Sequence, residues 1–93
     1  MNVTFWIPAP LRSMTGGRSR LHVETSGTTL HDALEALFAA HPGLRDRVLT
    51  EQWEIRQHVN VFVGNSEARS TSGLATPLAD GTEISIIPAI SGG

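Results

Sequence analysis

A chain of 93 residues can form one domain but is too short for two independent hydrophobic cores. With 40% hydrophobic and 17% charged residues it has a globular composition, and its net charge of −2 gives no electrostatic reason to expect nucleic acid or an anionic membrane as a partner. The sequence contains neither cysteine nor lysine, which excludes disulfides, iron–sulfur clusters, thiol catalysis and Schiff-base chemistry on a lysine.

The N-terminal segment predicts neither a targeting signal nor a membrane anchor. Met1-Asn2-Val3-Thr4 lacks the basic start and the apolar stretch of a signal peptide. No apolar run approaches the roughly 20 residues that a membrane-spanning helix needs. We therefore expect a cytoplasmic protein with no membrane partner.

The first 24 residues predict a β-hairpin. Apolar and polar residues alternate in Val3-Thr-Phe-Trp-Ile7, and Pro8 and Pro10 close this strand. Thr15-Gly16-Gly17 is a turn signal, and Arg20-Leu-His-Val-Glu24 then alternates again. Two antiparallel strands are therefore expected.

An amphipathic helix follows the hairpin. Thr29 is a suitable N-cap residue, and Asp32 three positions later completes a capping-box pattern. The next apolar residues have the spacing of one helix face: Leu30, Ala33, Leu34, Leu37 and Phe38. His41-Pro42-Gly43 is expected to end the helix.

The second half of the chain predicts the remaining strands. Residues 44–57 have a mixed pattern that indicates a helical turn followed by a loop. His58-Val-Asn-Val-Phe-Val63 predicts a strand, and Glu67-Ala-Arg69 a short edge strand. After the Asp80-Gly81 turn, Thr82-Glu-Ile-Ser-Ile-Ile87 predicts the last strand.

This order of elements favours an α+β fold of the β-grasp, ubiquitin-like type. One main helix can cover one face of a mixed four- to five-stranded sheet, and a right-handed crossover places the last strand beside the first and parallel to it. We expect one β-grasp domain over residues 1–88 and an extended, flexible C-terminal tail over residues 89–93.

Strand alternation predicts which side chains the helix leaves uncovered. One set of residues meets the helix, and the other set contains three large apolar residues, Trp6, Phe62 and Ile87. Large apolar side chains on an open face are typical of a partner-binding surface. The alternative is that residues 44–57 fold over them.

The side chains predict no catalytic or metal site. The four histidines lack metal-ligand spacing and a neighbouring carboxylate or cysteine cluster: His22, His31, His41 and His58. Gly16-Gly17 lacks a P-loop lysine and a following helix, and a hairpin turn explains it better than a phosphate site. We expect no metal, no bound cofactor and no catalysis by the domain itself.

The C-terminal tail remains as the candidate reactive group. Gly92 and Gly93 can enter a channel too narrow for side chains, although an ordinary loose end would also contain glycine. Pro88 fixes φ at the base of the tail, and each later residue can extend about 3.3–3.6 Å. A C-terminal carboxylate is an anion and a poor electrophile at neutral pH, so a reaction there requires activation. Adenylation with ATP by another protein is the natural route.

Together these features resemble the MoaD/ThiS family of ubiquitin-like sulfur carriers over essentially the whole chain. The most specific similarity is the ending, in which Asp80-Gly81 precedes an apolar strand, Pro88 and the final Gly92-Gly93. The segments 59–63 and 74–78 also look like family sequence. Within the family, the chain looks most like the carriers that serve cysteine synthesis.

The resemblance implies a sulfur-carrier cycle in which the protein is a co-substrate and not an enzyme. An E1-like enzyme would use ATP to adenylate Gly93, and a sulfur donor would convert the adenylate to a thiocarboxylate. An acceptor enzyme would then take the sulfur: a cysteine synthase-like enzyme, the large subunit of molybdopterin synthase or another synthase. Ile90, Ser91 and Gly92 would be the threading residues of the tail.

Three alternatives remain open. The chain could be the small subunit of molybdopterin synthase, or a ubiquitin-like modifier conjugated to other proteins through Gly93. It could also be a plain interaction module that uses the face with Trp6, Phe62 and Ile87.

Overall fold

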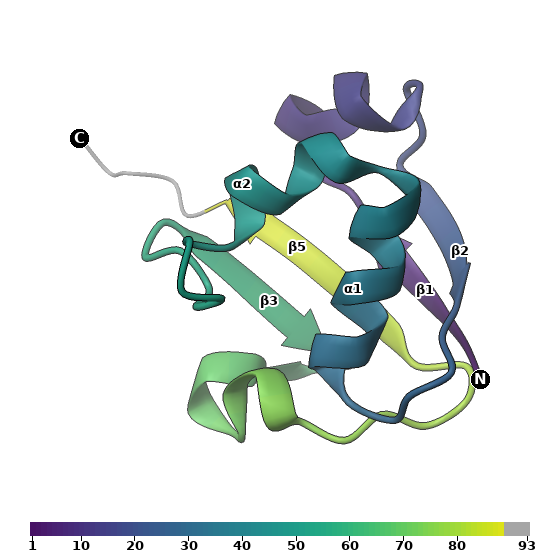
Figure 1. Ribbon diagram of the computed structural model, residues 1–93, viewed down its shortest axis with the longest axis vertical. Coiled ribbons are helices and arrows are strands. Elements are labelled where there is room, and N and C mark those ends of the chain that lie inside the picture. Colours follow the sequence, from purple (N-terminus) through teal and green to yellow (C-terminus); the bar gives the residue numbers. More distant parts are fainter. Residues whose placement is uncertain (89–93) are drawn as a thin grey trace.

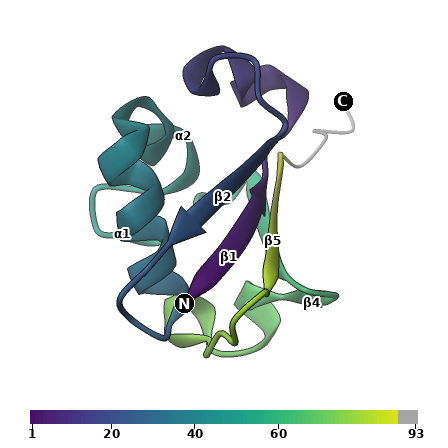
Figure 2. The same cartoon turned by 90° about the vertical axis from the view of Figure 1, so that its right-hand side faces the viewer.

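A computed structural model describes residues 1–88. Helices lie on one face of a five-stranded mixed sheet, and no helix covers the other face in this part of the chain (Figures 1 and 2). The predicted tail, including Ile90, Ser91, Gly92 and Gly93, lies outside the described residues. The division into a domain and a tail therefore stays a prediction.

The described residues form five strands and two α-helices, with short 3-10 helices in the connections. The strands are β1 (Asn2–Trp6), β2 (Arg20–Glu24), β3 (Val59–Val63), β4 (Ser66–Glu67) and β5 (Glu83–Pro88). The α-helices are α1 (Leu30–Ala40) and α2 (Arg45–Val48). The 3-10 helices span Ala9–Thr15, Pro42–Leu44, Ala68–Ser70 and Gly73–Ala75.

The order of strands across the sheet is β2-β1-β5-β3-β4. The last strand, β5, lies in the centre, parallel to β1 and antiparallel to β3. β1 pairs antiparallel with β2, and β3 pairs antiparallel with β4. The predicted β-grasp arrangement is confirmed, and β2 and β4 form the two edges of the sheet.

The turn before β5 is hydrogen-bonded to the start of β1. The backbone N–H of Asn2 donates to Oδ1 of Asp80 at 2.7 Å, and the N–H of Gly81 donates to the carbonyl of Asn2 at 2.7 Å. Gly81 has a φ of 86°, a left-handed conformation that glycine adopts without steric cost. This turn fixes the register in which β5 enters the sheet beside β1.

Helix α1 begins with the predicted capping box. The Thr29 hydroxyl accepts from the backbone N–H of Asp32 at 3.3 Å, and Oδ2 of Asp32 accepts from the N–H of Thr29 at 3.2 Å. The same carboxylate oxygen accepts from the Thr29 hydroxyl at 2.9 Å and from the N–H of Thr28 at 3.1 Å. These bonds satisfy backbone donors that a helix N-terminus otherwise leaves free.

The hydrophobic core lies between the sheet and α1. The predicted helix stripe is buried. Of the eight strand residues predicted on that face, Val63 is partly buried and the other seven are buried: Val3, Phe5, Ile7, Val59, Val61, Ile84 and Ile86. Residues 44–57 close the same side, because Leu44, Val48 and Leu49 are fully buried. The Trp53 ring lies 4.5 Å from the His31 ring of α1. The alternative that this segment covers the open face is therefore wrong (Figure 2).

Two connections differ from the sequence prediction. The segment between β1 and β2 contains the 3-10 helix Ala9–Thr15, which the prolines start and which buries Leu11 against the core. The predicted strand Glu67–Arg69 is wrong beyond Glu67, since the chain turns into the 3-10 helix Ala68–Ser70. The backbone N–H and the hydroxyl of Thr71 both donate to the Ala68 carbonyl in this turn, and the Arg69 guanidinium donates to the carbonyls of Arg56 and Val59.

Within residues 1–88, the longest helix is α1 with 11 residues, and none is long and apolar enough to cross a membrane.

Loss of the cap is expected to destabilise the fold in a pH-dependent way. Thr29→Ala should lower the free energy of unfolding by about 1 kcal/mol at neutral pH. Hydrogen bonds from the Thr29 side chain and then from its backbone lower the pKa of Asp32. The ionised carboxylate thus stabilises the fold above the unfolded-state pKa of about 3.9, and this contribution is lost as pH falls through the lower folded value.

Urea unfolding of Asp32→Asn against wild type, measured from neutral to acidic pH, checks this prediction. The stability difference should be present at neutral pH and shrink in acid. The matched control is Glu35→Gln, which removes an exposed helix carboxylate that takes no part in the cap. A difference for Asp32→Asn that stays constant across the pH range would contradict the account.

Candidate partner-binding face

The sheet face opposite the helices carries the predicted apolar residues. Trp6 at the end of β1 is 38% exposed and Ile87 near the end of β5 is 45% exposed, and they are the two exposed large hydrophobic residues of the described chain. Phe62 of β3 is half-buried. The predicted assignment of these side chains to the open face agrees with their burial, and their role in binding a partner stays a prediction.

Strand register places Trp6 and Phe62 in one row across the sheet. Ser85 of β5 pairs with Trp6 on one side and with Phe62 on the other. The small Ser85 side chain therefore lies between two large aromatic side chains at the centre of the face. Ile87 follows two residues later on β5, so it lies on the same face, nearer to the end of the described chain.

The Trp6 ring is held between two charged side chains. Its indole Nε1 donates to Oε1 of Glu83 at 2.7 Å, and the guanidinium carbon of Arg20 lies 5.6 Å from the ring centroid. The indole N–H thus has a partner within the protein, and the exposed part of the ring is apolar. A ring oriented in this way loses little conformational entropy on binding a partner.

Sequence reasoning missed Arg20 and Glu83 as neighbours of Trp6. Arg20 pairs with Trp6 across the β1–β2 ladder, whereas Glu83 is two residues before the Ser85 partner of Trp6. The Thr15-Gly16-Gly17 turn signal does not set the pairing of Arg20 with Trp6, because the connection between β1 and β2 contains a 3-10 helix. The contact of Glu83 with Trp6 could not be predicted from it either, because β5 comes from the far end of the chain.

A pocket lies next to the end of β5. Its lining includes Trp6, Pro8, Arg12 and Ile87. The last described residue, Pro88, pairs with Val59 of β3, beyond the last pair that β5 makes with β1. The described chain therefore ends beside the Trp6 end of the open face.

The prediction that no histidine has a carboxylate cluster was wrong for His31. His31, Asp32 and Glu35 offer ligand atoms within 4.8 Å of one another. Nδ1 of His31 lies 3.3 Å from Oε1 of Glu35, the i, i+4 neighbour that the sequence could have indicated. The helix cap uses Asp32 and the Trp53 ring stacks on His31, so the fold itself accounts for the group.

Comparison with known proteins assigns the family. The model of the ThiS family matches residues 5–93. Sulfur carrier protein CysO of Mycobacterium tuberculosis is 38% identical over 95 aligned positions, which cover 100% of both chains. Small archaeal modifier protein 1 of Haloferax volcanii is 38% identical over 86 positions, covering 91% of this chain and 93% of its own.

Solved structures agree with this assignment. A chain of the Amycolatopsis orientalis BexX/CysO complex matches with a TM-score of 0.86 and 32% identity, over 98% of this chain and 99% of that one. The crystal structure of Mycobacterium tuberculosis CysO matches with a TM-score of 0.85 and 34% identity, over 95% and 99% of the two chains. The resemblance stated from the sequence is confirmed: the chain belongs to the ThiS family and has its ubiquitin-like β-grasp fold.

Proposed function

We propose that this protein is a sulfur carrier that holds sulfur as a thiocarboxylate on Gly93. The observation that carries the proposal is the similarity to Mycobacterium tuberculosis CysO, which covers 100% of both chains. The family match also runs as far as residue 93. In this function the protein is a substrate of its partner enzymes and does not catalyse a reaction.

The proposed chemistry at Gly93 has two steps. A carboxylate oxygen attacks the α-phosphorus of ATP, which forms an acyl-adenylate and releases pyrophosphate. Hydrosulfide then attacks the acyl carbon and AMP leaves, so that sulfur replaces one carboxylate oxygen. Activation comes first because a free carboxylate is an anion at neutral pH and resists nucleophilic attack.

The chain's own residues support a passive role in this chemistry. Without cysteine or lysine, no thioester or isopeptide can form on its own side chains. ATP and the catalytic groups belong, in this proposal, to an E1-like partner, and a cysteine synthase-like enzyme or another synthase accepts the sulfur. Since the described chain ends at Pro88, close to Trp6 and Ile87, a partner docked on the open face would lie next to the start of the tail in this proposal.

A ubiquitin-like modifier is the second candidate function. The similarity to Haloferax volcanii small archaeal modifier protein 1, at 38% identity, favours it. The same adenylate on Gly93 would then be attacked by a lysine amine of another protein. The molybdopterin synthase alternative has weaker support, because the putative molybdopterin converting factor of Pyrococcus furiosus is 19% identical and shares the fold alone.

Intact-mass measurement tests the carrier function. After incubation with a cognate E1-like enzyme, ATP and sulfide, wild type should gain the mass difference between one sulfur and one oxygen atom. Deletion of Gly93 or a C-terminal tag should abolish the gain, because the reacting carboxylate is removed or displaced. An N-terminal tag, as the control, should leave the gain intact. Equal gains in all variants would contradict the proposal.

A digest of proteins from cells separates the two candidates. Because Arg69 is the last tryptic site of the chain, peptides in which residues 70–93 remain joined to a lysine of another protein, dependent on Gly93, are expected only for the modifier. Their absence together with the thiocarboxylate mass supports the carrier.

The open face is expected to bind the activating enzyme through Ile87. Ile87→Ala should weaken binding by about tenfold while leaving the thermal midpoint nearly unchanged, because the side chain is 45% exposed. Its neighbour Ile86 is 2% exposed and faces the core, so Ile86→Ala should cost about 2–5 kcal/mol of stability. Calorimetric titration and thermal unfolding of this matched pair measure both effects.

Phe62→Ala extends the test across the sheet. It should weaken the same binding without unfolding the domain. Unchanged binding for both Ile87→Ala and Phe62→Ala would remove the open face from the interaction.

A further inference from the structure

Strand β2 presents an unpaired backbone edge. It borders the sheet, with β1 on one side and no strand on the other among residues 1–88. The flanking pairs Met1–Thr25 and Ile7–Ser19 are hydrogen-bonded across the β1–β2 ladder. By alternation Leu21 and Val23 also bond to β1, and the N–H and C=O groups of Arg20, His22 and Glu24 point outward.

The two edges of the sheet differ in how they resist pairing. β4 is two residues long and turns at once into a 3-10 helix, which is a usual protection of an edge. β2 has five residues, Arg20-Leu-His-Val-Glu24, without a proline or a bulge. Arg20 at one end of β2 is positive and Glu24 at the other end is negative. A strand that places like charges opposite these two residues is repelled, whereas a strand that places a negative charge opposite Arg20 and a positive charge opposite Glu24 is attracted.

A second copy of β2, running antiparallel, has this reversed order. When the two strands are centred on His22, Arg20 faces the partner's Glu24 and Glu24 faces the partner's Arg20. Leu21 then faces the partner's Val23. Opposite charges and apolar pairs directly across a ladder are both stabilising, and each outward-pointing residue pair can exchange two backbone hydrogen bonds.

We propose that β2 is a self-association edge, through which two copies of this chain form a two-fold symmetric dimer with one continuous sheet. Arg20 and Glu24 supply the specificity. They are exposed, and neither makes an ion pair within residues 1–88. A dimer with the same patch on both subunits is the commonest symmetry of soluble oligomers.

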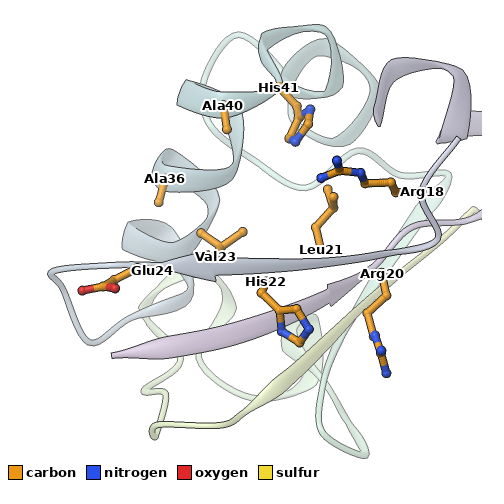
Figure 3. Close-up of a pocket in the computed structure, with 9 residues that line it drawn as sticks. All are labelled: Arg18, Arg20, Leu21, His22, Val23, Glu24, Ala36, Ala40 and His41. Atoms are coloured by element: carbon orange, nitrogen blue, oxygen red, sulfur yellow. The ribbon is translucent and has the colours of Figure 1, made fainter. Parts of the chain in front are cut away.

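The side chains next to β2 fit this arrangement. Leu21 and Val23 point toward α1, whereas Arg20 and His22 point to the other side of the sheet (Figure 3). Between β2 and α1 lies a pocket whose lining includes Ala36 and Ala40, small residues that leave room beside Val23. On the other side, the Arg20 guanidinium is already placed over Trp6 and the His22 Nδ1 lies 3.1 Å from the Thr4 hydroxyl.

The charges also select the register. A slip of two residues in one direction would place Arg20 opposite Ser26 and Glu24 opposite His22, and both ion pairs would be lost. A slip in the other direction would place Glu24 opposite Arg18, whose backbone N–H and carbonyl are already bonded to Thr15. A slip of one residue would place the free backbone groups of one copy opposite Leu21 and Val23 of the other copy, whose backbone groups already bond to β1. The register centred on His22 is the one that satisfies both the backbone and the charges.

Sedimentation equilibrium of the full chain at about pH 8 tests the proposal. Wild type should show a reversible monomer–dimer equilibrium. Arg20→Glu and Glu24→Arg should each raise the dissociation constant of the dimer by at least about tenfold, because each places like charges opposite each other twice in the symmetric dimer. The double variant Arg20→Glu with Glu24→Arg restores opposite charges and should dimerise like wild type.

Two further variants keep the test decisive. Glu51→Arg makes the same charge change at an exposed residue outside the sheet and should leave the dimer unchanged. His22→Pro removes an outward N–H that β1 does not use, so it should give a monomer that remains folded by circular dichroism. A wild type that stays monomeric into the millimolar range would overturn the proposal, as would single charge reversals that leave the dimer intact.

Discussion

The parallel pairing of β1 with β5 is the constraint on which the rest of the structure depends. It joins the two ends of the described chain at the centre of the sheet, and the Asp80-Gly81 turn sets its register through two short hydrogen bonds to Asn2. With this register fixed, Phe5 and Ile84 face the helix, while Trp6 and Ser85 face the open side. The strand that precedes the tail is therefore held on both sides along its first half.

This pairing also gives the two sheet faces different side chains. The helix face buries large aliphatic side chains and supplies most of the stability, since each contributes about 1.5–3 kcal/mol when fully buried. The open face keeps Trp6 and Ile87 exposed, with the indole oriented by Glu83 and Arg20. We propose that this face serves recognition, and the described chain ends next to it at Pro88.

The sequence was sufficient for the fold because its patterns are local. The helix stripe and the Thr29–Asp32 cap lie within a few residues. Strand alternation alone placed Trp6 and Ile87 on the open face and Phe5 and Ile86 on the face that the helix covers. The contacts it missed depend on pairing between distant segments: Glu83 with Trp6, and Arg69 with the carbonyls of Arg56 and Val59 at the turn that ends β4. The tail residues carry a functional prediction that rests on composition and family similarity, and the described structure ends at Pro88.

The central claim is that Gly93 carries the sulfur, and fragmentation of the C-terminal peptide tests it most directly. After treatment with the activating enzyme, ATP and sulfide, the protein should be digested with trypsin and its last peptide sequenced by tandem mass spectrometry. The account predicts that the sulfur-for-oxygen mass change appears in every fragment that contains Gly93 and in no fragment that lacks it. A change located on any other residue, or no change in a reaction that consumes ATP, would contradict it.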